Sequence, residues 1–570
     1  MPGFSVALWT QHQLLITLRA VALAQMNTKL QLRWVFAVQA VLLVVAAVRN
    51  VHQLNPDAVA YMRIAGYYAG GQWDLAVTGY WGPLLSWLMV PLLKAGMAPL
   101  VAARVVMALS GVVFLCGAVA VFRSFRLPRL ALVTGAWIAA GWSVFWSVRN
   151  ISPDLLMAGL VGLAVRATVE GFLFARRSRL IAAGTWWGVA FLAKAVVLPL
   201  AVLVTASFIG FAASGRPELR RGLAVRLGTV WLCLTLVAGP WIGALSVHYG
   251  KFTFSTTGPI AHALAGPGEQ SRYHPAMVTL HQPDAGRVTQ WEEPSRMAYR
   301  FWSPFSSAEN FRHQLEVVWW NAGTIASWLQ GVRWLTGAED VRNVAGMLPG
   351  FDLLGLSLVA VAGGLAVGCI QARRLRRVRW CWAVGPVVCL GGLYLPFWVQ
   401  AEDQRYFYAA LPFVWVLVIG GWRWTCAQGW IWTRTIRLRL FRLAAVAFLI
   451  PPGLWLSAAI WGIPNPASRT ARELAAELGA LRVNGPFAGS ASLTGGRTGL
   501  YTACLLGERW LGDDAAAPPA AFEAAGVRVV FLRSSPQAEA FAADSRWRKL
   551  DTRAGQGSIM AYARVSSLSP

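Results

Sequence analysis

Residues 100–122 read LVAARVVMALSGVVFLCGAVAVF, and residues 130–148 read LALVTGAWIAAGWSVFWSV. Each run is close to the ~20 apolar residues that a helix needs to cross a bilayer. The short turn between them, RSFRLPR, carries Arg123, Arg126 and Arg129. Further basic turns separate apolar runs along the chain, at 176–179, 216–226, 373–379 and 423–442. Because Lys and Arg gather in cytoplasmic loops, this pattern predicts an α-helical polytopic membrane protein with these turns on the inner side.

The composition supports a membrane protein. Hydrophobic residues make up 56% of the 570-residue chain and charged residues only 13%, against roughly 25% charged residues in soluble domains. The formal net charge of +26 does not indicate a nucleic-acid binder, because the basic residues lie in turns between apolar runs. All but Glu170 and Glu218 of the 25 acidic residues fall on the opposite, outer side. Chemistry that uses carboxylates is therefore expected there.

Threading the chain with the basic turns inside predicts about eleven spans, with the N-terminus inside and the C-terminus outside. The apolar segment 81–97 is not counted, because a span there would move every later basic turn to the outside. We therefore expect residues 1–464 to form a membrane module with outer loops at 51–99 and 247–350, helices within those loops, and parts of the first loop lying on or in the membrane surface. The predicted spans are 33–50, 100–122, 130–148, 154–175, 180–194, 196–213, 227–246, 351–371, 380–399, 407–424 and 441–461.

Residues 465–570 are expected to form a small soluble α/β domain on the outer side. A helical pattern at 469–481 precedes a short apolar strand at 527–532, with Gly- and Pro-rich turns between them. The stretch GGRTG at 495–499 lacks the Lys and Ser/Thr context of a P-loop. A lid or docking domain without a nucleotide site is the expected role.

Two carboxylates stand at the outer ends of predicted spans. Asp57 belongs to the stretch Asn55–Arg63, which reads NPDAVAYMR, and Asp154 follows Ser152 and Pro153. In the first turn of a helix each acid is favoured by the helix dipole, so both can be ordinary N-terminal helix acids. A carboxylate at the membrane boundary is costly unless it is paired or functional. The functional alternative is a general base or a substrate-orienting acid.

Two cations on the outer side are candidates for binding a phosphate. Lys194 ends a predicted span, so its ammonium group either snorkels to the interface or supplies a counter-charge at membrane depth. Arg405 has the planar fork that suits phosphate oxygens, or it forms a salt bridge with the neighbouring Glu402 or Asp403. Further candidates for substrate contact are Tyr61, Arg63, Glu402, Asp403 and Tyr406.

The outer loop 247–350 is rich in His, Trp and Tyr. Its histidines show neither an HExxH motif nor i, i+4 spacing with a partner acid, and the cysteines of the chain show no metal-ligand spacing. No metal-ligand set is therefore predicted. The aromatic side chains could stack on sugar rings or simply lie in the membrane interface.

These stretches together resemble the bacterial GT-C-type glycosyltransferases, the broad group of the protein O-mannosyltransferases and the lipid A aminoarabinose transferases. The order of spans, loops and outer C-terminal domain is similar as well. The resemblance implies a transferase that uses a polyprenyl-phosphate-linked sugar, with Asp57 as the catalytic-loop carboxylate and Asp154 lining the same cavity. The residues that carry it are NPD with Tyr61 at 55–61, GYWGPLLSW at 79–87, Ala103-Arg104, SPD at 152–154, Lys194, and Arg405-Tyr406 with Pro412.

Two positions depart from the family pattern. Many relatives carry an acid after the first Asp, where this chain has Ala58. Relatives of the aminoarabinose type carry a Lys where this chain has Gly82. The donor phosphate would then need Lys194 or Arg405 as its cation.

The resemblance implies an inverting hexosyl- or pentosyltransferase of the bacterial inner membrane, with its active site on the periplasmic side. Its partners would be the lipid-linked donor, a glycan, lipid or protein acceptor, and membrane lipids, but no nucleic acid. No cofactor is assigned, although a divalent cation could bridge the phosphate to Asp57. The alternative is a transporter or flippase of a lipid-linked envelope precursor, because charges near a membrane can mark a substrate path. The absence of repeated halves argues against it.

Overall fold

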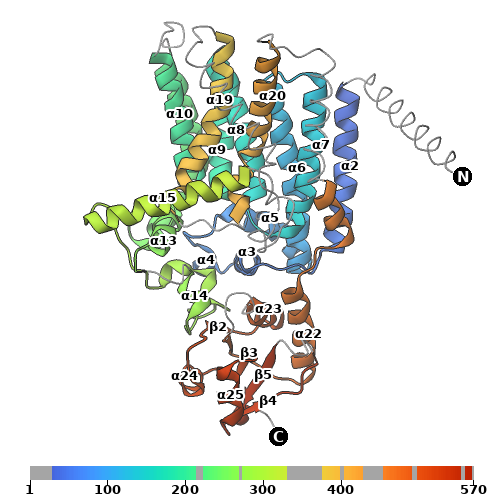
Figure 1. The fold of residues 1–570 in the computed structure, drawn as a ribbon, viewed down its shortest axis with the longest axis vertical. Coiled ribbons are helices and arrows are strands. Elements are labelled where there is room, and N and C mark those ends of the chain that lie inside the picture. The colour runs from blue at the N-terminus through green and yellow to red at the C-terminus, as the bar shows by residue number, and fades with distance from the viewer. Residues whose placement is uncertain are drawn as a thin grey trace, which may run out of the picture.

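The apolar runs form helices that stand side by side in one bundle, with a small sheet below it (Figure 1). The computed structural model describes residues 28–213, 222–268, 273–329, 375–397, 403–427, 453–490, 497–553 and 559–567. The helices that stand in the bundle are α2 (Thr28–Arg49), α6 (Pro99–Ser124), α7 (Arg129–Arg149), α8 (Asp154–Phe174), α9 (Arg177–Ala193), α10 (Val197–Ala213), α12 (Leu223–Tyr249), α19 (Leu375–Tyr394) and α20 (Leu411–Ala427).

Five helices are long and apolar enough to cross a membrane, namely α2, α6, α7, α8 and α12. They coincide with five of the predicted spans, so the protein is a multi-pass membrane protein. Helices α9 and α10 have 17 residues each, the lower limit for a span, and α19 and α20 contain shorter apolar stretches. The predicted span 351–371 lies outside the described residues, and only 453–461 of the last one is described, as helix. The total of eleven therefore stays a prediction.

Small residues let the central helices approach closely. Helix α8 is buried along nearly its whole length, whereas α2 and α12 expose apolar side chains such as Val41 and Leu236. A Cβ atom added at Gly117 of α6 would lie 2.2 Å from the carbonyl oxygen of Gly159 in α8. Close backbone contact of this kind is the usual way in which helices pack in a membrane. It places the first turn of α8 inside the bundle.

Short helices of the outer loops cover the lower end of the bundle in Figure 1. Helix α5 has 12 residues, too few to cross a bilayer, which agrees with the exclusion of 81–97 as a span. The helices of these loops are α3 (Pro56–Ala69), α4 (Trp73–Ala76), α5 (Pro83–Lys94), α13 (Thr257–Leu264), α14 (Pro275–Val278), η1 (Gln290–Glu292), η2 (Pro294–Arg296), α15 (Ala308–Leu329) and η3 (Asp403–Phe407).

The start of the first outer loop is bonded to a segment more than 400 residues later. Asn50 donates to the carbonyl oxygen of Ala459 over 2.7 Å and accepts from the backbone N–H of Ile463 over 2.8 Å. The N–H of Leu54 donates to the hydroxyl of Ser468 over 3.0 Å. The first loop is thereby held between the end of α2 and the beginning of the C-terminal region.

The C-terminal region contains a five-stranded mixed sheet with the strand order β2-β1-β3-β5-β4. Strand β1 pairs in parallel with β2 and β3, and β5 pairs antiparallel with β3 and β4. The expected helix at 469–481 and strand at 527–532 correspond to α22 and β3. The elements are α22 (Pro466–Ala480), β1 (Phe487–Gly489), α23 (Arg497–Leu506), β2 (Trp510–Asp513), α24 (Pro519–Ala524), β3 (Val529–Leu532), α25 (Pro536–Ala543), β4 (Trp547–Lys549), β5 (Met560–Arg564) and η4 (Val565–Ser567).

The two faces of the sheet belong to different apolar cores, because successive residues of a strand point to opposite faces. Val530 and Leu532 pack in a separate core with Phe522 of α24 and Phe541 of α25. Residues of the other face, such as Phe531, join the core that also contains α22, α23 and the membrane helices. The C-terminal region is thus attached to the membrane module through α22 and α23.

Replacing Gly117 by Ala tests the contact between α6 and α8. The added methyl group would meet backbone of α8, so we expect a loss of about 1–3 kcal/mol from overpacking. Thermal unfolding of the purified protein in detergent measures it. Gly243→Ala in α12 is the matched control, because nothing lies within 4 Å of the position that its new methyl group would take. Equal midpoints for both variants would contradict the close approach of the two helices.

Candidate active site

Four charged side chains from four separate segments meet at one end of the bundle. Asp57 of α3 is paired with Arg405 of η3. The Nε atom of Arg405 also lies 4.0 Å from Asp154 at the first position of α8, and Asp154 is paired with Lys194 over 2.5 Å. Arg405 therefore lies between the two carboxylates. We refer to Asp57, Asp154, Lys194 and Arg405 as the charged cluster.

The four members of the charged cluster differ in exposure. The side chain of Asp154 is only 2% exposed, whereas the side chains of Asp57, Lys194 and Arg405 are 14%, 21% and 19% exposed. A carboxylate as buried as Asp154 needs a paired cation, because removing it from water costs several kcal/mol. The other three side chains remain within reach of a ligand.

Helix starts place both carboxylates. Pro56 is the first residue of α3 and Asp57 is the second. In the same way, Pro153 directly precedes Asp154, the first residue of α8. Proline is favoured at a helix start and the dipole there favours a negative charge. The structural and the functional interpretations of these acids are thus compatible.

Polar side chains join the two loops that carry the carboxylates. The Oδ1 atom of Asn55 accepts from the N–H of Ile151 over 2.8 Å, and its Nδ2 atom donates to the carbonyl oxygen of Ile151 over 3.3 Å. The buried guanidinium of Arg104 donates to Val148 over 3.0 Å and to the carbonyl of Gln53. These bonds bring the start of α3 beside the start of α8. Sequence reasoning missed both roles, although an Arg inside an apolar run must find acceptors.

Lys194 is placed by the end of α9. The helix stops at Ala193, and Lys194 has extended backbone angles, φ −153° and ψ 128°. A Cβ atom added at Gly82 would lie 2.2 Å from the carbonyl oxygen of Ala193. The first outer loop therefore presses against the end of α9 at a point where a side chain has no room. A lysine at position 82 would not fit this contact, while Lys194 provides a cation next to it.

Aromatic rings surround the charged cluster. The Lys194 ammonium lies 4.2 Å from the ring centroid of Tyr406, and Tyr406 is stacked on Tyr394 at 4.8 Å. Tyr61 lies one helical turn after Asp57. Its ring packs edge-on against the ring of Trp81, with 5.1 Å between the ring centroids. Burial, followed by the negative charges of Asp57 and Asp154, raises the pKa of Tyr61 well above its ordinary value. Tyr61 is therefore a neutral phenol beside the two carboxylates.

Arg63 does not join the charged cluster. Its Nη2 atom donates to the hydroxyl of Tyr67 over 3.3 Å, and its Nε atom lies 3.7 Å from Glu292. Glu292 also accepts from Tyr67 over 2.5 Å and from the N–H of Val288 over 3.1 Å. Burial raises the pKa of Glu292, in opposition to these bonds. This group attaches α3 to η1, so the placement of Arg63 favours a structural role over the expected substrate contact.

The side chains of two expected site residues lie outside the described part of the chain. Glu402 lies outside the described residues, and the side chain of Asp403 at the start of η3 is likewise not described. Within the described part of the chain, no group of three or more His, Cys, Asp or Glu side chains is arranged to hold a metal ion. The two carboxylates of the charged cluster are already paired with cations. The side chains of the charged cluster that the structure describes thus do not fit a divalent cation.

A half-buried histidine next to the site connects two outer segments. The Nε2 atom of His274 is 2.9 Å from the hydroxyl of Tyr80, and its Nδ1 atom is 3.1 Å from that of Tyr299. Trp291 packs against its ring at 4.7 Å. Burial lowers the pKa of His274 to about 3, so the imidazole is neutral in the folded protein.

Acid should therefore destabilise the outer loops through His274. Below its ordinary pKa of 6.5 the unfolded chain binds a proton that the folded chain does not bind until about pH 3. The free energy of unfolding then falls as the pH falls from 6.5 towards 3, and at pH 5 the loss is about 2 kcal/mol. Thermal midpoints of the wild type and His274→Gln between pH 5 and pH 8 measure it. The variant should give the flatter profile, and parallel profiles would contradict the assignment.

No family model matches the chain, and no curated protein matches its sequence. Solved structures do match it in fold. The crystal structure of ArnT from Cupriavidus metallidurans bound to undecaprenyl phosphate is 16% identical, with a TM-score of 0.55 over 94% of this chain and 99% of that chain. The apo state of the same protein is 17% identical, with a TM-score of 0.54 and the same coverage.

The archaeal oligosaccharyltransferase AglB from Archaeoglobus fulgidus, in complex with an inhibitory peptide and a dolichol-phosphate, is 12% identical. Its TM-score is 0.46, over 94% of this chain and 75% of that chain. The likeness to ArnT extends over nearly the whole length of both chains. The chain described here therefore has the GT-C fold of the membrane glycosyltransferases, as the motifs in its sequence predict.

Proposed function

We propose that the protein is a membrane glycosyltransferase that moves a sugar from a polyprenyl-phosphate donor to an acceptor on the periplasmic side of the bacterial inner membrane. The observation that carries the proposal is the charged cluster, in which two carboxylates and two cations from distant segments meet at the boundary of the bundle. Intramembrane and boundary charges of this kind mark functional sites. The GT-C fold and the binding of undecaprenyl phosphate by ArnT, the structural neighbour, support the same interpretation.

Lys194 and Arg405 would bind the phosphate of the donor. Both are partly exposed and both already contact the carboxylates, so a phosphate would compete with Asp57 and Asp154 for them. The fork of Arg405 can hold two phosphate oxygens, and Lys194 adds a point charge. These cations would also stabilise the charge that develops on the leaving phosphate.

Asp57 would act as the general base. In the structure its carboxylate is paired with Arg405, which restricts its ability to take a proton. When the donor phosphate draws Arg405 away, Asp57 is released beside the sugar. It would then accept the proton of an acceptor hydroxyl or amine as that group attacks the anomeric carbon and the lipid phosphate leaves with the bonding electrons. Direct attack from the opposite side inverts the anomeric configuration.

Asp154 would position Lys194 and take no part in proton transfer. It is buried and bonded to Lys194 over 2.5 Å, so an acceptor has little access to it. Tyr61 is neutral, adjacent to both acids and buried, so it would support the acids from behind. The half-buried ring of Tyr406 would form an apolar wall against the sugar.

Removing either cation should weaken binding of the donor phosphate. A hydrogen bond to a charged group contributes about 1.5–3 kcal/mol, so Lys194→Gln and Arg405→Gln should each raise the Kd for undecaprenyl phosphate about 10- to 100-fold. Native mass spectrometry of the purified protein titrated with the lipid measures the Kd.

Two controls make this measurement specific. Lys94→Gln changes an exposed lysine at the end of α5, outside the charged cluster, and should leave the Kd unchanged. Undecaprenol, which has the lipid tail without the phosphate, should bind equally to all variants. Unchanged binding of undecaprenyl phosphate in both site variants would remove the phosphate assignment.

Asp57→Asn should abolish most of the transfer reaction while leaving donor binding at least as tight as in the wild type, because the phosphate no longer competes with a carboxylate for Arg405. General-base catalysis contributes roughly 10²- to 10⁴-fold, so the rate should fall by that factor. Release of undecaprenyl phosphate from the lipid-linked sugars of bacterial membrane extracts, incubated with proteoliposomes, measures turnover. Asp74→Asn, which changes an exposed acid of the same outer loop, is the matched control. Full turnover in Asp57→Asn would exclude the base assignment, and translocation of the lipid without release would favour a flippase.

A further inference from the structure

Helix α15 has three distinct faces along its length. One face contacts the protein, and its side chains are bonded there: His313 to the carbonyl of Ala265 over 2.7 Å, and Asn321 to the carbonyl of Leu395 over 2.8 Å. Val317 between them is only 2% exposed. Residues spaced by four lie on one side of a helix. This protein-facing side therefore fixes the orientation of the rest of α15.

The side of α15 that faces away from the protein is divided into an apolar and a charged stripe. Phe311, Leu315 and Trp319 are 48%, 53% and 82% exposed, and their spacing of four places them in one line. Arg312 and Glu316, each one residue later in the chain, are exposed in a neighbouring line, which ends at the 51% exposed Trp320. A helix in contact only with water would have no reason to segregate its exposed residues in this way.

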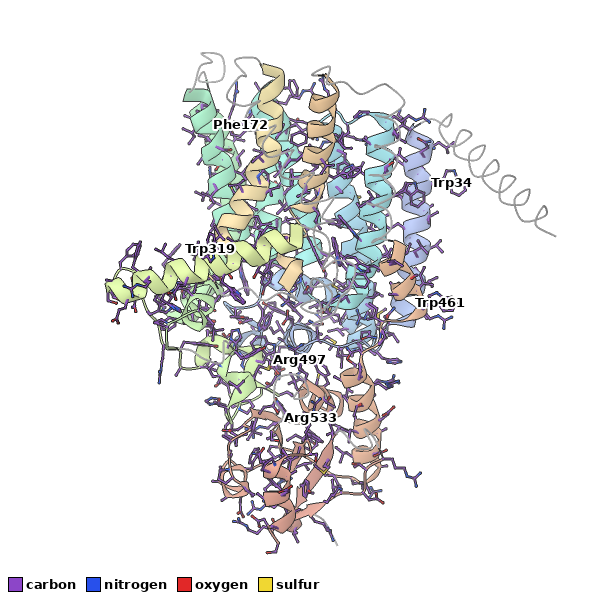
Figure 2. All side chains as sticks on the ribbon, viewed as in Figure 1. Trp34, Phe172, Trp319, Trp461, Arg497 and Arg533 are labelled. Atoms are coloured by element: carbon purple, nitrogen blue, oxygen red, sulfur yellow. The ribbon has the colours of Figure 1, made fainter. Side chains whose placement is uncertain are left out.

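Helix α15 lies across the bundle at the lower ends of the spanning helices and extends beyond them to one side (Figure 1). Figure 2 shows Trp319 on the edge of α15 that faces the level of the spans, and Trp461, which is 85% exposed, near the same end on the other side of the bundle. Two further aromatic side chains just before α15, Phe301 and Phe305, are 66% and 87% exposed.

We propose that α15 is an interfacial helix that lies in the surface of the bilayer, with Phe311, Leu315 and Trp319 inserted among the acyl chains. The argument is one of continuity: the apolar stripe extends the lipid-facing surface of the spans at the depth where Trp residues settle in membrane proteins. The charged stripe of Arg312 and Glu316 faces the water and the head groups. The occupant of the exposed apolar face is thus phospholipid.

Photocrosslinking in proteoliposomes that contain only this protein and phospholipid tests the proposal. The photoreactive amino acid p-benzoylphenylalanine is introduced at Trp319 in one variant and at Glu316, on the charged stripe, in a matched control. After illumination, the peptide carrying position 319 should gain the mass of one phospholipid, and the peptide carrying position 316 should not. The yield at 319 should persist at high salt, because contact through apolar side chains is not screened.

Three results would overturn the proposal. A peptide at position 319 without lipid adduct would place the stripe in water. A crosslinked dimer would assign the stripe to a second copy of the chain. Equal lipid adducts at 316 and 319 would mean that α15 has no fixed orientation in the interface. If the variant at 319 does not fold, the same substitution at Leu315 on the same stripe gives the comparison with position 316.

Discussion

The burial of one carboxylate at the membrane boundary is the constraint on which the site depends. Asp154 is 1% exposed, and an unpaired carboxylate there would cost several kcal/mol. The dipole of α8 offsets only about 0.3–1 kcal/mol of that cost. Cations must therefore reach the first turn of α8, and they come from the end of α9 and from η3 as Lys194 and Arg405. The convergence of these two segments on α8 follows from this requirement.

The same requirement bears on ligand binding. The charged cluster contains two carboxylates and two cations, so its formal charge is balanced before any ligand arrives. An anionic ligand can bind to it only by exchanging with one of the carboxylates. Asp57 is the more exposed of the two and is held by Arg405 alone among the cluster's cations, whereas Asp154 contacts both. An anionic ligand therefore replaces Asp57 at lower cost than it would replace Asp154.

Charged residues at the ends of apolar runs can be found from the sequence, because few such residues occur there. Asp57, Asp154, Lys194 and Arg405 stand out in this way, and the structure brings them together. Which of these residues pair with one another cannot be predicted from the sequence, because the partners are far apart in it. Arg405, for example, pairs with Asp57. Proximity in the sequence suggests Arg63 as a site residue. However, Arg63 lies six positions after Asp57, and this spacing puts the two side chains on different sides of α3. The strand order of the C-terminal sheet depends on crossovers that hydrophobic periodicity does not encode.

The hydrogen bonds between the first outer loop and residues 459–468 bear on the biogenesis of the protein. Asn50 and Leu54 leave the ribosome early, but their partners Ile463 and Ser468 are made only after nearly all the spans have been translated. The segment that carries Asp57 can bond to Ile151 and Arg104 early in synthesis, but its contacts with residues 459–468 form late. Translation of the last part of the membrane module therefore completes its attachment.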